Sequence, residues 1–150
     1  MLIADLYHSK VKTILPNTTV QESLKRMMDE QINAFIVVDA NEHVVGILSL
    51  QDIAAATVPE EFQHNSGMAK AMYVQGFFHQ ICQNLKDRPI SEVMRKKFIT
   101  VDLQTNILAI MSDFLEHDLY VVPVMDGDKL LGVITRTEVK RALAKGMHLL

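Results

Sequence analysis

The pattern of apolar and polar positions along this chain occurs twice. An apolar run at 34–38 leads through a short polar loop into a second run at 44–49, and the same arrangement returns at 120–125 and 130–135. The two copies align at an offset of 87 residues before the loop and 86 after it, because the second loop is one residue shorter. An internal repeat decides the architecture of a chain, so we expect two copies of one structural unit.

The apolar runs of each copy predict strands. They are rich in β-branched residues and too short for typical helices, which favours buried strands. Turn-forming residues at 41–43 and 127–129 predict a hairpin in each copy. In chain order, the predicted strands are 10–15, 34–38, 44–49, 98–103, 120–125 and 130–135.

Each copy also contains two predicted helices. The first helix runs from Thr19 to about Gln31, since Thr19 and Glu22 have the spacing of a capping box, and its counterpart has Thr105 as the expected N-cap. The helices after the returning strands are predicted at 50–56 and 136–145. The residues expected to face the core at helical spacing are Val20, Leu24, Met27 and Met28 in the first copy, and Ile107, Ile110, Met111, Phe114 and Leu115 in the second.

The segment between the copies, 57–89, is too long for a plain connection and is expected to have structure of its own. Asn65 and Ser66 are expected to cap one helix over 67–85, and Gly76 in its middle predicts a close packing contact there. The helix either covers an edge of the molecule or forms a dimer or partner contact. Its apolar face is predicted to comprise Met68, Met72, Phe78, Ile81, Cys82 and Leu85.

Composition narrows the class of protein. Apolar residues make up 49% of the chain and charged residues 22%, which is typical of a globular domain. A net charge of −3 argues against a nucleic-acid partner. No apolar run approaches the roughly 20 residues of a membrane span, and no signal-peptide pattern is present, so no membrane association is expected. With a single cysteine, Cys82, the expected location is the cytoplasm.

The sequence predicts no catalytic centre and no metal site. The six histidines have no metal-ligand spacing, and neither a paired CxxC nor a HExxH motif is present. Nucleotide-binding glycine motifs and the nucleophile elbow are absent as well. Cys82 lies on the apolar face of a predicted helix, where a thiol is inert. We therefore expect neither an enzyme nor a catalytic cofactor.

The ordered set of elements, ending in Gly-apolar-apolar-Ser/Thr-x-x-Asp, resembles the cystathionine-β-synthase (CBS) domain, and two copies resemble the CBS pair, or Bateman module. The resemblance implies an α+β fold in which two β-α-β-β-α repeats are related by a pseudo-two-fold axis. The expected bounds are 1–56 for the first repeat, 57–89 for a helical insertion and 90–150 for the second repeat.

The resemblance also implies a regulatory ligand between the repeats: an adenine nucleotide (AMP, ADP or ATP) or S-adenosylmethionine. In the first site Asp52 would accept hydrogen bonds from ribose hydroxyls, Ser49 would lie near the phosphate at a helix N-terminus, and Gly46 would permit a close backbone approach. The base pocket would be lined by Thr13, Ile14, Ala34 and Phe35.

In the second site Glu138 stands where the family has aspartate, which weakens the expected ribose contact. The remaining residues implied there are Ile99, Thr100, Tyr120, Val121, Thr135 and Arg136. Arg136 either neutralises a phosphate or is a solvated surface residue, and Tyr120 either stacks on a base or is a half-buried strand residue. Both Ser49–Asp52 and Thr135–Glu138 also have the spacing of helix capping boxes that need no ligand.

The function expected from the resemblance is energy sensing by allostery, in which the ligand shifts an equilibrium between arrangements of the two repeats or of two associated modules. The resemblance further implies a homodimer and a separate regulated protein. The alternative is a ligand-free scaffold that recruits a partner through the helix between the repeats.

Overall fold

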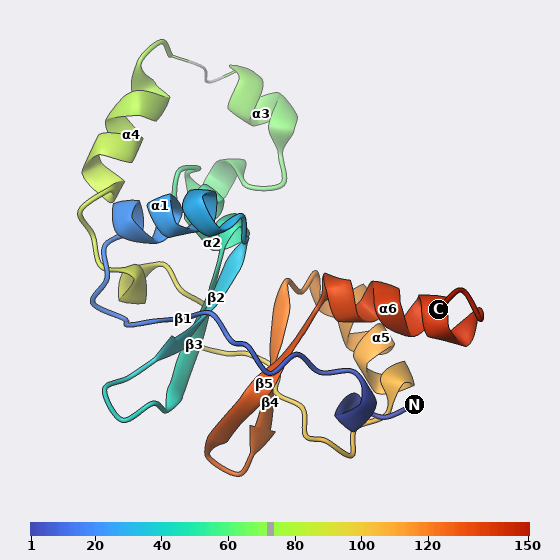
Figure 1. Ribbon diagram of the computed structural model, residues 1–150. Helices are drawn as coiled ribbons and strands as arrows, with labels where there is room; N and C mark the ends of the chain where they lie inside the picture. The colour runs from blue at the N-terminus through green and yellow to red at the C-terminus, as the bar shows by residue number, and fades with distance from the viewer. Residues whose placement is uncertain (72–73) are drawn as a thin grey trace.

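A computed structural model of the protein describes residues 1–71 and 74–150. Its strands form two sheets, one in each repeat (Figure 1). In the first sheet β2 (Ala34–Val38) lies between β1 (Thr13–Ile14), which is parallel to it, and β3 (Val44–Ser49), which is antiparallel. The second sheet consists of β4 (Val121–Asp126) and β5 (Lys129–Thr135), which pair antiparallel. The predicted α+β class and the tandem repeats are confirmed.

The predicted strand at 98–103 is wrong. Among the described residues, Val101 makes only an isolated parallel bridge with Val124 of β4. In the first repeat the N–H of Ile36 donates to the carbonyl of Lys12 at 3.0 Å and holds the edge strand. The residue equivalent to Ile36 is Pro123, which has no N–H to donate. The second repeat therefore lacks the bond that would fix this strand.

Four helices follow the order of the repeat: α1 (Val20–Glu30), α2 (Leu50–Ala55), α5 (Ile107–His117) and α6 (Arg136–Gly146). The predicted cap of α1 is confirmed, since Thr19 Oγ1 accepts from the N–H of Glu22 at 3.2 Å. The predicted cap of α5 is wrong by one residue. Asn106 Oδ1 accepts from the N–H of Ala109 at 3.0 Å, whereas the hydroxyl of Thr105 donates to Asp102 Oδ1.

The predicted apolar stripes are only partly buried. Val20 and Met27 lie in the core, and Ser23 is buried between them with its hydroxyl donating to the carbonyl of Val20 at 2.7 Å. Met28 is 72% exposed and Leu115 is 89% exposed. Helical spacing alone therefore predicted a wider buried face than either helix has.

The repeats exchange their N-terminal segments (Figure 1). The 3-10 turn η1 (Ile3–Asp5) packs Ile3 into the core of the second repeat, with the N–H of Ile3 bonded to the carbonyl of Thr105 at 2.9 Å. Its counterpart η3 (Ile90–Glu92) packs Ile90 into the first core, bonded to the carbonyl of Thr18 at 2.8 Å. Each core is therefore completed by a segment from the other repeat.

The crossing segments explain the two equivalent glycines. A Cβ on Gly46 would lie 2.9 Å from the carbonyl oxygen of Arg95, and one on Gly132 would lie 2.4 Å from that of His8. Glycine at these positions therefore makes room for the protein's own crossing backbone. A third apolar cluster joins the two sheets and comprises Ile36, Val38, Ile47, Val121 and Val133.

In the segment between the repeats, the described residues form two helices, α3 (Ser66–Ala71) and α4 (Phe77–Leu85), after the 3-10 turn η2 (Glu60–Phe62). The prediction of one continuous helix is wrong, because Gly76 has φ 83° and is the N-cap that precedes α4. A Cβ built on Gly76 meets nothing within 4 Å, so the glycine serves the left-handed backbone and no packing contact.

Part of the predicted helix surface is confirmed. Asn65 Oδ1 accepts from the N–H of Met68 at 3.0 Å, as expected of a cap, and Leu85 is buried in the first core. Phe78, by contrast, is 64% exposed, and Met72 lies outside the described residues. In Figure 1, α3 and α4 stand out beyond α1 and α2. None of the helices in the described ranges combines the length and the hydropathy that crossing a bilayer requires.

Candidate functional site

Two cavities lie between the repeats, and both repeats line each of them. The first, of about 350 Å³, is called cavity 1 and the second, of about 400 Å³, cavity 2. Cavity 1 is lined by Ile47, Ser49, Asp52, Arg95, Lys97, Phe98, Ile99, His117, Asp118, Leu119, Tyr120 and Val121. Cavity 2 is lined by His8, Lys10, Lys12, Gln31, Ile32, Asn33, Ala34, Ile36, Tyr120, Val121, Val133, Thr135, Arg136, Thr137 and Glu138.

In cavity 1, Ser49 and Asp52 lie where β3 ends and α2 begins. Asp52 Oδ2 accepts from the N–H of Ser49 at 2.8 Å and from its hydroxyl at 2.9 Å, and Ser49 Oγ accepts from the N–H of Asp52. This is a complete capping box, so the prediction that Ser49 and Asp52 cap a helix is confirmed, and this role needs no ligand. Oδ1 of Asp52 makes no hydrogen bond within the described ranges, which leaves one carboxylate oxygen available to a ligand.

The opposite wall of cavity 1 comes from the second repeat. Ile99, Tyr120 and Val121, which sequence reasoning assigned to the second site, line the same cavity as Ser49 and Asp52. A half-buried phenol ring and apolar side chains thus line the same cavity as a carboxylate. Such a combination fits a flat heterocycle joined to a hydroxyl-bearing group.

Sequence reasoning missed Arg95 and Lys97, which also line cavity 1. Neither makes an ion pair in the part of the chain that the structure describes. The repeat could have indicated them, because the residues equivalent to Arg95 and Lys97 at the offset of 87 are His8 and Lys10, which line cavity 2. Both pairs lie where the chain crosses from one repeat to the other, which the sequence alone did not reveal.

In cavity 2, the equivalent capping box is formed by Thr135 and Glu138. Glu138 Oε2 accepts from the N–H of Thr135 at 2.8 Å and from its hydroxyl. The extra methylene does not push the carboxylate outward, because Glu138 folds back on the helix start and is only 3% exposed. Its carboxylate is therefore much less available than that of Asp52.

Arg136 and Tyr120 contact each other. The guanidinium carbon lies 4.6 Å from the centroid of the Tyr120 ring, Nη2 lies 3.2 Å from Asp118 Oδ1, and Nε donates to the carbonyl of Leu119 at 3.3 Å. Arg136 is thus an exposed arginine that is held by protein groups, and its expected phosphate contact remains a prediction. It lies on the wall shared by the two cavities, since Tyr120 lines both.

The remaining predicted residues lie elsewhere, apart from Ala34, which lines cavity 2. Ile14 and Phe35 belong to the first core, and Thr100 is exposed. The carbonyl of Thr13 accepts from Arg26 Nη1 at 3.2 Å. None of these four lines either cavity.

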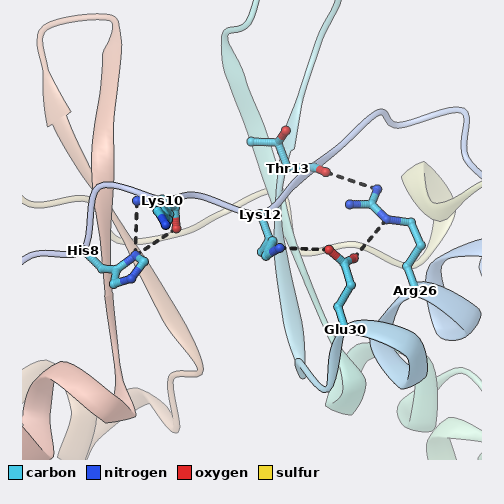
Figure 2. A network of polar contacts seen from close by, with 6 residues as sticks. All are labelled: His8, Lys10, Lys12, Thr13, Arg26 and Glu30. Carbon is cyan, nitrogen blue, oxygen red and sulfur yellow. Dashed lines mark hydrogen bonds and ion pairs between the residues drawn. The ribbon is translucent and has the colours of Figure 1, made fainter.

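An ion-pair network fixes one cation at the edge of cavity 2. Figure 2 shows Glu30 between Lys12 and Arg26, with Lys12 Nζ at 3.0 Å from Oε1 and Arg26 Nε at 3.3 Å from Oε2. The hydrogen bond from Lys12 is the main cause that lowers the pKa of Glu30, and the positive charges of Lys12 and Arg26 add to it, against a smaller effect of desolvation. Lys12 is therefore partly neutralised by the protein itself.

One group of side chains on α5 has metal-ligating chemistry. Asp113, Glu116 and His117 each place one ligand atom within 4.8 Å of the others. Glu116 and His117 are exposed, and such groups are common on helix surfaces without an ion. The sequence prediction that no metal is bound remains a prediction.

The exchanged segments, the two hairpins and the two inter-repeat cavities define a tandem-repeat module. A family model described as "CBS domain" matches residues 3–58 and 90–145, so the chain belongs to the CBS domain family and contains two such domains. The predicted family is confirmed. The predicted bounds of the insertion, 57–89, stay a prediction.

Curated relatives share the sequence over most of this chain. The chain is 27% identical over 143 residues to an uncharacterized protein of Methanocaldococcus jannaschii, matching 95% of this chain and 39% of that protein. It is 24% identical over 126 residues to a CBS domain-containing protein of Arabidopsis thaliana, matching 84% of this chain and 19% of the relative. The chain thus spans less than two fifths of the length of these relatives.

Solved structures confirm the fold. A CBS-domain containing protein from Agrobacterium tumefaciens matches with a TM-score of 0.73 and 22% identity, covering 94% of this chain and 92% of that one. CBSX2 in complex with AMP matches with a TM-score of 0.70 and 21% identity, covering 96% of each chain. The CBS domain pair of protein MJ0100 was solved in complex with 5′-methylthioadenosine and S-adenosyl-L-methionine. It matches with a TM-score of 0.71 and 21% identity, covering 97% of this chain and 98% of that one.

Proposed function

We propose that this protein is a regulatory module that binds an adenine nucleotide or a related adenosyl compound in cavity 1. The observation that carries the proposal is the convergence of three kinds of group on one cavity. A carboxylate oxygen of Asp52 has no partner within the described ranges, and Tyr120, Arg95 and Lys97 line the same cavity.

Each group suits one part of such a ligand. A carboxylate accepts hydrogen bonds from both hydroxyls of a ribose, and an aromatic ring stacks on a base. Arginine and lysine bind phosphate through charge-assisted hydrogen bonds. Two structural neighbours support the ligand class, since one was solved with AMP and the other with 5′-methylthioadenosine and S-adenosyl-L-methionine.

The output of this module is a change in the equilibrium between arrangements of the repeats. A ligand shifts such an equilibrium only by its difference in affinity for the two arrangements. Because segments of both repeats line cavity 1, a bound ligand contacts both of them at once. We further propose a homodimer that passes the change to a separate regulated protein, with no catalytic step.

Isothermal titration calorimetry with AMP, ADP, ATP and S-adenosylmethionine tests the ligand. At least one of them is expected to bind with a saturable isotherm. Asp52→Asn is expected to weaken it by about tenfold or more, since it removes a charged acceptor. The amide oxygen of asparagine still accepts from the N–H of Ser49, so the helix cap is retained.

The matched control is Thr19→Ala, which removes a cap at α1 outside both cavities. It is expected to lower the free energy of unfolding by about 1 kcal/mol and to leave ligand affinity unchanged. Equal binding by Asp52→Asn and the wild type would contradict the assignment of Asp52.

A ligand-free scaffold is the second candidate, and the exposed apolar residues Phe77 and Phe78 of α4 favour it. In that case no adenosyl compound binds at millimolar concentration, and α4 becomes the surface through which the protein acts.

A further inference from the structure

The apolar stripe of α4 is covered by the protein at one end only. Leu85, at the C-terminal end of the helix, is buried in the first core. One turn earlier, Ile81 and Cys82 are half-buried. At the start of the helix, Phe78 is 64% exposed and Phe77 is 46% exposed. These residues follow one another at intervals of three or four, so they share one face of the helix, and that face continues beyond the core into solvent.

The uncovered start of α4 requires a surface to pack against. The helix has nine residues, and helices shorter than about 12–15 residues are marginal in water without tertiary packing. Val74 precedes the helix and is 63% exposed, and its carbonyl accepts from the N–H of Phe77 at 3.1 Å. We call Val74, Phe77 and Phe78 the α4 patch. In Figure 1 the start of α4 lies at the end of the molecule that is farthest from both sheets.

The charge of this segment favours a second copy of the chain as the occupant. From Ala71 to Leu85 the sequence contains no aspartate, glutamate, lysine or arginine. A charged peptide or an anionic membrane is recognised through opposite charge, which this segment does not offer. A two-fold axis, by contrast, places the same patch of both copies against each other. An uncharged aromatic patch can make that contact without repulsion between like charges.

The area of the α4 patch fits the apolar centre of a small dimer interface. From their exposed fractions, Phe77 and Phe78 present roughly 200 Å² per copy. Two copies thus supply about a third of the roughly 1,200 Å² at the lower limit of stable interfaces. Gln75, His79 and Gln80 beside the patch are exposed and polar, as the rim of an interface is. An interface of this size is expected to dissociate on dilution.

We propose that two copies of this chain associate through the α4 patch, with their α4 helices packed against each other across a two-fold axis. The proposal rests on the homodimer of the proposed function and names its interface. Among the described residues, those that line the two cavities include none from α3 or α4, so this surface is separate from the ligand site. A dimer of this kind also covers the surface that the scaffold candidate would use.

Sedimentation-velocity ultracentrifugation over a range of protein concentrations tests the interface. The wild type is expected to dimerise as its concentration rises. Phe78→Ser should raise the dissociation constant by about tenfold or more, because each dimer loses two aromatic anchors. The matched control is Leu115→Ser, at an 89% exposed position of α5, which should leave the dissociation constant within about twofold of the wild type. Both replaced side chains are exposed, so circular dichroism should show unchanged helix content in each variant.

Two results of this experiment would overturn the interface. One is a wild type that stays monomeric up to about 1 mM, since contacts weaker than this have no specific stability. The other is dimerisation that Phe78→Ser leaves intact, or that Leu115→Ser abolishes instead, which would place the contact on another surface.

Hydrogen exchange supplies a measurement that needs no variant. The N–H of Gln80 donates to the carbonyl of Gly76 at 3.0 Å and reports on the first turn of α4. This amide should exchange more slowly above the dissociation constant than below it, because a second copy covers the helix. The amides of α5 should exchange at the same rate at both concentrations. Slower exchange on α5 with no change at Gln80 would contradict the proposal.

Calorimetry with AMP separates this proposal from the proposed function. If Phe78→Ser disrupts the dimer but no adenosyl compound binds the wild type, the nucleotide function is wrong and the interface stands. If AMP binding depends on Asp52 while the wild type is monomeric, the interface and the homodimer are wrong and the nucleotide site stands. If Leu115→Ser disrupts the dimer and Phe78→Ser does not, the homodimer stands and the α4 interface is wrong.

Discussion

Gly46 and Gly132 illustrate how single residues determine the packing of this protein. Both lie where a crossing segment of the other repeat touches a hairpin strand, and both leave room for its carbonyl. The sequence showed that the two glycines are equivalent, but the crossing backbone could not be predicted. A glycine that leaves room for a ligand and a glycine that leaves room for a crossing backbone segment occur in the same sequence pattern.

Gly132→Ala is expected to destabilise the protein by about 1–3 kcal/mol, the usual cost of overpacking. The new Cβ would lie 2.4 Å from the carbonyl oxygen of His8, so the paired hydrogen bonds between His8 and Val133 must shift. Urea unfolding measures the change. Gly146→Ala is the control, because a Cβ there meets nothing within 4 Å, and no loss of stability is expected from it.

The pKa of Glu30 tests the ion-pair network at the edge of cavity 2. Lys12→Gln should raise this pKa toward the ordinary value of 4.5, since the hydrogen bond from Lys12 is the main cause of its lowering. A folded-state pKa below the unfolded one means that this contribution to stability is present above pH 4.5 and is lost as the pH falls through the folded pKa. Carboxyl NMR titration measures the pKa of Glu30 in the folded wild type and in the folded variant. An unchanged pKa in the variant would show that Arg26 alone holds Glu30.

At the scale of elements, local rules predicted the starts of α1, α2 and α6, were one residue off at α5, and failed at the edge strand 98–103. The boxes Ser49–Asp52 and Thr135–Glu138 are local in sequence, so their spacing is sufficient to predict them. The strand at 98–103 depends on a donor from a distant residue, and Pro123 cannot supply it. The break at Gly76 was missed because helical periodicity continues across it, whereas the positive φ is visible only in the backbone.

Pro123→Val tests why the second sheet lacks its third strand. The variant restores an N–H at the position equivalent to Ile36. Its expected acceptor is the carbonyl of Ile99, which is equivalent to the carbonyl of Lys12 that accepts from Ile36. Little net change in stability is expected, because a hydrogen bond of about 1 kcal/mol is offset by a more flexible unfolded chain. Hydrogen exchange should instead show the new amide at residue 123 protected like that of Ile36. Rapid exchange at this amide would contradict the explanation.

At the scale of the whole molecule, the exchange of segments ties the two repeats together. Ile3→Ala is expected to cost about 2–5 kcal/mol although Ile3 lies far from the second repeat in sequence, because its side chain is fully buried in that core. Thermal unfolding followed by circular dichroism should remain a single transition in the variant. Two separate transitions would show that the repeats unfold independently. Leu115→Ala, at an 89% exposed position, is the control.

The repeat itself could be predicted from the sequence. Which residues share a cavity could not. The alignment shows that Ile3 and Ile90 are equivalent, yet it does not indicate which core each of them enters. For the same reason, the sequence did not indicate which residues of the second repeat line cavity 1 together with Asp52.

The exchanged segments also bear on how such a chain could arise. A polypeptide with only one repeat would have to lend its first residues to a second copy of itself, as domain-swapped dimers do, and would obtain two identical cavities by symmetry. Joining both copies in one chain makes the exchange intramolecular and independent of protein concentration. It also removes the symmetry, so a substitution such as aspartate to glutamate changes one cavity and leaves the other intact. Covalent linkage therefore allows the two cavities of one chain to diverge independently of each other.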